Sequence, residues 1–235
     1  MEMSRKVARK DAGGGRVVLA IDTCGPTGSV ALGRVDGQAV EILGQIELEG
    51  RNYSSTLVAA VGELLVHAGI KLSLLHAIVA VDGPGSFTGV RVGLAAVKGL
   101  AEGARIPVVA VSRLEVLAAK AGVLPAALDA HRHEVFLRLD LAGERGRELL
   151  AGAEELAAID PVPTRIALCD EAAAELLASA WPGAELVRTS APTAADALRL
   201  GAPRMATGEF VDLALLDGHY LRRSDAEIFG EPVRA

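Results

Sequence analysis

A glycine-rich loop between a short apolar run and a segment with helical periodicity constrains this chain more than any other feature. The run covers residues 77–81, and the loop Gly-Pro-Gly-Ser-Phe-Thr-Gly covers residues 83–89. A solid apolar run that is too short for a helix is typical of a strand buried on both faces. A serine after a glycine turn is typical of a helix N-terminus. We therefore expect a strand, a tight loop and a helix to about Gly103, the unit from which α/β folds are built.

The loop has the composition of an anion-binding site, because a helix N-terminus offers free backbone amides and favours negative charge. It lacks the G-K-[ST] ending of a nucleotide-binding P-loop. It is not a nucleophile elbow either, because Pro84 and Thr88 stand where that motif needs glycines. We therefore expect Ser86 to cap the helix rather than to act as a nucleophile.

A carboxylate and a hydroxyl follow the first apolar run of the chain. Asp22 and Thr23 come after residues 17–21 and before a glycine turn. In phosphate-binding folds such a carboxylate can hold a metal-bound water, but the same pair also starts ordinary turns. One carboxylate does not make a magnesium site, so we expect no cofactor. The candidate cofactor-binding residues are Asp22, Thr23, Gly83, Gly85 and Ser86.

Two similar series of elements account for nearly all of the chain. Strands at 17–21, 29–32 and 39–48 predict an antiparallel meander, followed by a helix from Asn52 and the strand, loop and helix described above. Further strands are expected at 106–111, 124–130, 134–141, 146–150, 165–169 and 185–187, and helices at 114–121, 171–180 and 193–207. The repeated order predicts two duplicated α/β lobes, 16–105 and 106–235, each with a mixed sheet flanked by helices, after a disordered basic leader at 1–15.

Charge and composition restrict the partners. The chain has 24 Lys and Arg against 30 Asp and Glu, a net charge of −6, and only 3% aromatic residues. An acidic chain has no general attraction for phosphates, and RNA-stacking surfaces need exposed aromatic rings. Any RNA contact must therefore be local or made through a partner. The two cysteines have no CxxC spacing, and no apolar run is long enough to span a membrane, which predicts a cytoplasmic protein.

The histidines do not form a recognisable metal site. A zinc motif H-E-x-x-H that began at His133 would need a second histidine where Leu137 stands. His131 could share a strand face with His133, but no third ligand is near in the sequence. We expect neither a metal nor a catalytic residue in this chain.

The two N-terminal helices carry a second small or apolar face beside the one that faces the core. In the first helix the predicted core face consists of Leu57, Val58, Val61, Leu64, Leu65 and Ala68. A glycine inside a helix costs about 1 kcal/mol relative to alanine, and close contact with another helix would offset that cost. The second faces are covered either within the domain or by a partner subunit. The candidate partner-binding residues are Ala59, Gly62, Glu63, Val66, Gly93, Ala96, Val97 and Leu100.

Several segments together resemble the TsaB family, also called YeaZ. They are Leu-Ala-Ile-Asp-Thr at 19–23, Ser-Val-Ala-Leu at 29–32, the loop Gly-Pro-Gly-Ser-Phe-Thr-Gly-Val-Arg at 83–91, Lys-Gly-Leu-Ala at 98–101, Val-Ser at 111–112, Asp-Ala at 129–130, Glu-Val at 134–135 and Tyr-Leu-Arg-Arg at 220–223. The resemblance implies the two-lobed fold of the actin, hexokinase and Hsp70-like ATPases (ASKHA). It also implies a non-catalytic paralogue of the enzyme TsaD, which makes the N6-threonylcarbamoyl modification of tRNA adenosine (t6A).

The resemblance also implies partners. The chain is expected to form a heterodimer with a TsaD homologue through its N-terminal helices, and a TsaE-type ATPase is expected to join the pair. Transfer RNA would be bound only by the complex, and ATP, ADP and iron would be held by the partner subunits. Whether the isolated chain also forms a homodimer stays open. The chain departs from the family pattern at Asn52–Tyr53, where a histidine is common, and at Phe136, where a tyrosine is common.

Two functions from different classes remain. The favoured hypothesis is a scaffold or activator subunit without chemistry of its own. The rival is an active ATPase or small-molecule kinase of the same fold, which would use Asp22 and the loop at 83–89, with Asp129 as a second carboxylate. A glycoprotease fails for lack of a zinc motif and an elbow serine.

Overall fold

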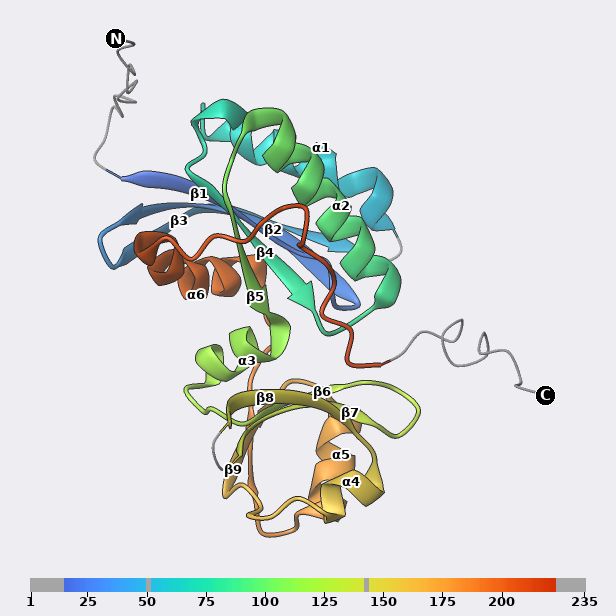
Figure 1. Ribbon diagram of the computed structural model, residues 1–235. Coiled ribbons are helices and arrows are strands. Elements are labelled where there is room, and N and C mark those ends of the chain that lie inside the picture. Colours follow the sequence, from blue (N-terminus) through green and yellow to red (C-terminus); the bar gives the residue numbers. More distant parts are fainter. Residues whose placement is uncertain (1–14, 50–51, 142–143, 223–235) are drawn as a thin grey trace, which may run out of the picture.

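The computed structural model describes residues 15–49, 52–141 and 144–222, which form two α/β lobes, each built on a five-stranded sheet (Figure 1). The predicted basic leader lies outside the described residues, apart from Gly15. Among the described residues no helix is both long and apolar enough to cross a membrane.

The first sheet has the order β3-β2-β1-β4-β5. Its strands are β1 (Arg16–Asp22), β2 (Thr27–Asp36), β3 (Ala39–Glu49), β4 (Ala77–Gly83) and β5 (Val108–Ser112). β1 pairs antiparallel with β2 and parallel with β4, so the predicted meander is confirmed. Val18, Leu19 and Ala20 are fully buried because helices cover both faces of the sheet, as the solid apolar run predicted.

Two helices cover one face of this sheet and one helix covers the other (Figure 1). α1 (Tyr53–His67) and α2 (Phe87–Ala104) lie side by side on the first face, and a short 3₁₀ turn, η2 (Leu72–Leu74), leads from α1 to β4. α6 (Ala194–Thr207) covers the opposite face. Ser86 caps α2 as predicted, since its hydroxyl accepts a hydrogen bond from the backbone of Gly89.

The second sheet has the order β10-β9-β6-β7-β8. Its strands are β6 (Ala126–Asp129), β7 (Val135–Leu141), β8 (Glu144–Ala151), β9 (Arg165–Leu168) and β10 (Glu185–Arg188). As in the first sheet, a meander of three antiparallel strands is extended by two parallel ones, so the two lobes share one topology. This shared order supports the predicted duplication.

The second lobe is completed by α4 (Ala153–Ala157) and α5 (Glu171–Ala180) below its sheet and by α3 (Arg113–Ala121) between the two sheets (Figure 1). The bounds of α5 match the prediction. α4 was not predicted, because five residues are too few to show a helical period.

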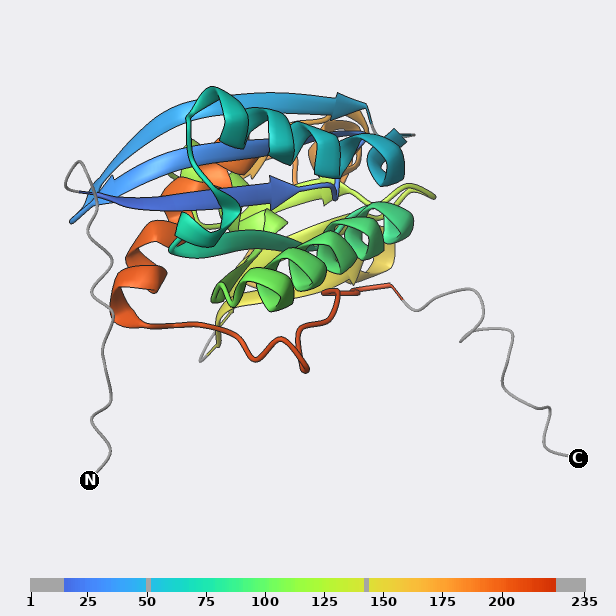
Figure 2. The same ribbon diagram turned by 90° about the horizontal axis from the view of Figure 1, so that it is seen from above.

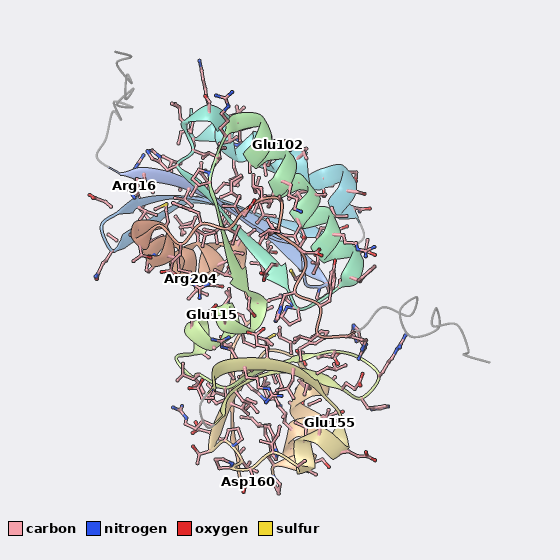
Figure 3. The ribbon with its side chains drawn as sticks, viewed as in Figure 1. Arg16, Glu102, Glu115, Glu155, Asp160 and Arg204 are labelled. Atoms are coloured by element: carbon pink, nitrogen blue, oxygen red, sulfur yellow. The ribbon has the colours of Figure 1, made fainter. Side chains whose placement is uncertain are left out.

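The structure differs from the predicted division between residues 105 and 106. β5 pairs in parallel with β4, since its apolar side chains complete the first sheet. The chain then crosses to the second lobe through α3 and returns with α6, whose apolar face packs on the first sheet. Glu115 of α3 and Arg204 of α6 form an ion pair where the two crossings meet (Figure 3). The first lobe therefore draws on two separate parts of the chain.

Close contact between α6 and β4 predicts a stability difference between two glycines. A Cβ at Gly201 would lie 2.7 Å from a methyl group of the fully buried Val79, whereas nothing lies within 4 Å of a Cβ at Gly99 in α2. Gly201→Val should destabilise the fold by about 1–3 kcal/mol through overpacking. Gly99→Val, the control for helix propensity, should not. Urea unfolding of both variants measures the difference, and equal stabilities would contradict this packing.

Candidate functional site

The candidate cofactor residues lie where β1 and β4 end. Because these strands are parallel neighbours, Asp22 and the loop after β4 meet at one edge of the sheet. There the segment after β1 forms hydrogen bonds with the loop after β4. The hydroxyl of Thr23 donates to the carbonyl of Gly89 at 2.7 Å, and the backbone amide of Ser86 donates to the carbonyl of Cys24 at 2.8 Å.

The glycines of the loop are required by this contact. A Cβ at Gly85 would overlap the carbonyl oxygen of Cys24, and a Cβ at Gly89 would overlap that of Thr23. The backbone after β1 thus packs directly against the loop, whereas Ser86, Phe87 and Thr88 at the helix N-terminus stay exposed. The structure brings the predicted residues together, but it also binds the loop to the backbone of its own chain.

Asp22 is enclosed by an ion pair that spans the lobes. Its carboxylate is 1% exposed, and its Oδ2 lies 3.5 Å from Nε of Arg113, the first residue of α3. Its Oδ1 accepts a hydrogen bond from the backbone of Cys24 at 2.8 Å. Burial of an ion pair requires that each charge be compensated by the other. The carboxylate therefore has its counter-charge within this chain, although neither its Oδ2 nor Nε of Arg113 forms a hydrogen bond with a described residue.

Arg113 is the functional residue that sequence reasoning missed. Its guanidinium lies so close to Gly25 that a Cβ at this position would overlap it. The hydroxyl of Tyr53 donates a hydrogen bond to the carbonyl of Gly25 at 2.7 Å. One weak signal in the sequence could have indicated this role of Arg113, namely its position in the first turn of a helix. A cation in the first turn opposes the helix dipole, so Arg113 needs a compensating anion elsewhere.

The neighbouring thiol and phenol stay protonated at neutral pH. Burial, reinforced by the charge of Asp22, raises the pKa of Cys24 well above its ordinary value. The same two causes raise the pKa of Tyr53 to about 12. Neither group is an activated nucleophile, because nucleophilic sulfur requires a lowered pKa.

Asp129, the second carboxylate of the rival hypothesis, contacts His131 in the turn that follows it. Its Oδ2 lies 2.9 Å from Nδ1 of His131, and its Oδ1 accepts the backbone amide of the same residue. Within the described part of the chain no three His, Cys, Asp or Glu side chains gather into a metal-binding group.

The second face of α1 is exposed as predicted. Ala59, Gly62 and Glu63 are exposed, and Val66 is 80% exposed. Val58 and Ala68, which were assigned to the core face, are also exposed, so that part of the prediction is wrong. The core is instead contacted by Tyr53 and Ala60 together with the predicted leucines.

The prediction for α2 needs correction. Gly93 and Val97 are buried in the core face of α2, and a Cβ at Gly93 would overlap the hydroxyl of Thr23. Ala96 and Leu100 are half-buried and pack against the core. The interpretation that the domain covers these residues is therefore the correct one for α2. Its exposed small residues are Ala95, Gly99 and Gly103.

Some helix glycines are not required by packing within the described part of the subunit. Nothing lies within 4 Å of a Cβ at Gly62, Gly99 or Gly103. α1 and α2 lie next to each other on the same face of the first sheet (Figure 2). We call their exposed residues Ala59, Gly62, Glu63, Val66, Ala95, Gly99 and Gly103 the helical face.

Known proteins share this fold. A crystal structure from Pseudomonas aeruginosa, of a protein with similarity to peptidase YeaZ, is 31% identical over 88% of this chain and 100% of its own length, with a TM-score of 0.70. A second structure, YeaZ from the same organism, is 29% identical with a TM-score of 0.68. TsaB of Haemophilus influenzae is 38% identical over 125 residues, 51% of each chain. The chain belongs to the TsaB (YeaZ) family.

The chain also matches the family model of TsaD, the paralogue of TsaB. The family model of TsaD, tRNA N6-adenosine threonylcarbamoyltransferase, matches residues 42–160. TsaB of Bacillus subtilis is 38% identical over 126 residues, 52% of this chain and 54% of its own length. The match thus spans about half the length of the curated relatives. The resemblance seen in the sequence is confirmed, as is the ASKHA-type fold with two mixed sheets.

The Asp22–Arg113 pair predicts a large, rescuable loss of stability. Arg113→Met leaves a buried carboxylate without its cation, which should cost about 3–5 kcal/mol. Asp22→Asn in addition removes the charge, so the double variant should be more stable than Arg113→Met alone. The control is Arg165→Met, whose pair with Glu185 is exposed and should contribute little.

Thermal or urea unfolding of the three variants measures these differences. An Arg113→Met variant as stable as the native chain, or a double variant no better than the single one, would contradict the assigned role of the pair.

Proposed function

We propose that this chain is a non-catalytic scaffold subunit that forms a heterodimer with the catalytic paralogue TsaD in the t6A modification of tRNA. Its curated relatives are named tRNA threonylcarbamoyladenosine biosynthesis proteins, and the match to the TsaD family model supports the paralogue relationship. In this proposal the complex is cytoplasmic. A TsaE-type ATPase joins it, the partners hold iron and nucleotide, and tRNA is bound by the assembly.

The observation that carries the proposal is the closed edge of the first sheet. In an enzyme, a carboxylate after β1 and a glycine loop after β4 would have to reach a metal-bound phosphate. Here the Asp22 carboxylate is 1% exposed and pairs with Arg113. The loop binds the backbone of Thr23 and Cys24. These groups support a structural role for a site that other folds of this type use for chemistry.

The helical face supports docking to a partner. Its glycines carry the cost of glycine inside a helix, about 1 kcal/mol each, and nothing within the subunit uses the space that they leave. Small residues allow another helix to approach at 8–10 Å, the spacing of ridge-into-groove packing. A TsaD homologue is the proposed occupant, and a second copy of this chain is the alternative that the test distinguishes.

The rival is an active ATPase or kinase that uses Asp22 and the loop at 83–89. We expect the purified chain to show neither ATP hydrolysis nor threonylcarbamoyl transfer above the blank, because the Asp22 carboxylate is buried beside Arg113 and does not reach solvent. Phosphate release in the presence of Mg²⁺ and ATP measures the first. Turnover that disappears in Asp22→Asn would refute the scaffold proposal and support the rival.

The helical face is tested by Gly62→Arg. A long cation there should prevent close docking and leave a buried unpaired charge, which should weaken binding to a TsaD homologue by at least about 100-fold. The monomer should keep its melting temperature, because nothing surrounds Gly62 within 4 Å. Ala178→Arg on the exposed side of α5 is the matched control.

Titration calorimetry with the TsaD homologue gives the affinities, and gel filtration of the chain alone reports any homodimer. Unchanged affinity in Gly62→Arg would refute this face. A homodimer that Gly62→Arg disrupts while TsaD binding persists would assign the face to self-association.

A further inference from the structure

The segment after α6 contacts both lobes. We call residues 209–222 the C-terminal strap. The backbone amide of Val211 donates to the carbonyl of Val108 in β5 at 2.9 Å, and that of His219 donates to the carbonyl of Asp82 in β4 at 2.8 Å. Arg222 pairs with Glu134 of the second lobe. The strap thus runs along the edge of the first sheet and ends beside the second lobe (Figures 1 and 2).

A second contact joins the strap to the first turn of α2. The rings of Tyr220 and Phe87 lie with their centroids 5.2 Å apart. The guanidinium of Arg91 lies 3.8 Å from the ring centroid of Phe87 and 6.0 Å from that of Tyr220. The docked strap therefore contacts the side chains of Phe87 and Arg91, which stay exposed on their other sides.

One buried carboxylate contacts the strap and both lobes. Glu148 of β8 has a side chain only 6% exposed. It accepts hydrogen bonds from Ser112 of β5 at 2.7 Å and from Arg138 of β7 at 2.8 Å. Nε2 of His219 lies 2.9 Å from its Oε2. Glu148 thus connects β5 of the first lobe, two strands of the second lobe and the strap.

A second acid lies under the strap without such support. The strap passes so close to the end of β4 that a Cβ at Gly83 would lie 2.7 Å from the carbonyl oxygen of His219. Oδ1 of Asp82 is buried and accepts no hydrogen bond from the described residues. A buried carboxylate without a partner is costly when ionised and tolerable when protonated.

We propose that the C-terminal strap is a pH-dependent latch, which is docked through His219 at mildly acidic to neutral pH and is released as the pH rises, because uncharged His219 no longer compensates the buried carboxylates of Asp82 and Glu148. Release would remove the ring of Tyr220 from Phe87 and Arg91 of α2. This latch is independent of the proposed function, since it concerns only contacts within the chain.

Loss of the proton from either His219 or Asp82 weakens docking of the strap. The hydrogen bond to Glu148, helped by the charges of Glu148 and Asp82, raises the pKa of His219 despite its burial and Arg138. Its contribution to docking is therefore complete below the free histidine value and is lost as the pH rises through the raised one. Burial and Glu148 raise the pKa of Asp82 to about 7, against His219 and Arg204. The contribution of protonated Asp82 to docking is thus complete below the ordinary value of 3.8 and is lost as the pH rises from there to about 7.

The remaining charged groups do not titrate near neutral pH. Burial opposes the ionisation of Glu148, but its hydrogen bonds with His219, Ser112 and Arg138 outweigh burial and lower its pKa. Its contribution is lost only in acid, as the pH falls through that lowered value. Arg138 and Arg204 stay charged, and Arg204 is paired with Glu115 of α3. Docking should therefore weaken as the pH rises, through Asp82 up to about pH 7 and through His219 above the ordinary histidine value.

Tyrosine signals report the latch directly. The chain contains only two tyrosines, so ring ¹³C labelling of tyrosine gives NMR signals from Tyr220 on the strap and from Tyr53, which is 4% exposed in the core. We expect the Tyr220 signals to move toward their value in an unfolded peptide between pH 6 and 8.5. The Tyr53 signals should stay constant, because its phenol, with a pKa of about 12, remains protonated.

Three variants assign the transition. Glu148→Gln and His219→Gln should shift release to lower pH or abolish docking, and Asp82→Asn should make the transition shallower and keep the strap docked to higher pH. Glu185→Gln, in the exposed pair with Arg165, should titrate like the native chain. Native Tyr53 signals identify variants that are folded.

Two results would overturn the latch. The first is a Tyr220 signal that does not change between pH 6 and 8.5 in the native chain. The second is an Asp82→Asn variant, folded by its Tyr53 signal, that titrates with the native midpoint and slope.

Discussion

The buried ion pair between Asp22 and Arg113 is the interaction on which the rest of the structure depends. It joins the end of the central strand of one lobe to the first turn of the helix that lies between the lobes. Removing two charges from water is unfavourable unless each finds the other, so the pair fixes α3 against the first sheet. The backbone after Asp22 is then held against the glycine loop by hydrogen bonds from Thr23 to Gly89 and from Ser86 to Cys24.

This closure explains why function is proposed on the outside of the lobe. The helices that flank the closed edge use one set of glycines for contact within the chain and leave another set free. Gly85 and Gly89 allow backbone segments to meet, and Gly93 leaves room for the side chain of Thr23. Nothing lies within 4 Å of a Cβ at Gly62, Gly99 or Gly103. A subunit that acts by docking needs exposed glycines such as Gly62, which allow a partner helix to come close. A nucleotide-binding enzyme would instead need open space beside the loop glycines Gly85 and Gly89.

Much of the fold was predictable, because its strands are short solid apolar runs and its turns contain glycine. The helix from Glu171 to Ala180 was predicted with the bounds that the structure shows. The division of the lobes was not predictable. β5 finds its place by pairing with a distant strand, and α6 crosses back to the first sheet, and neither event leaves a local signal.

The candidate site shows the same limit. Asp22 and the loop at 83–89 could be identified from their positions after two strands, but the contact with Arg113 is long-range and was missed. In α2, small and apolar residues occur on nearly every side, so periodicity could not decide that Gly93 and Val97 face the core. In α1, Val58 is as apolar as the core residues, yet it is 60% exposed, and only packing distinguishes them.

Hydrogen–deuterium exchange of the chain, measured with ATP and Mg²⁺ and separately with a TsaD homologue, tests the central claim most directly. The account predicts that ATP leaves exchange unchanged in the peptides that contain residues 22–25 and 83–93. It predicts that the TsaD homologue slows exchange in α1 and α2. Protection of residues 22–25 and 83–93 by ATP, without any effect of the TsaD homologue on the two helices, would contradict it.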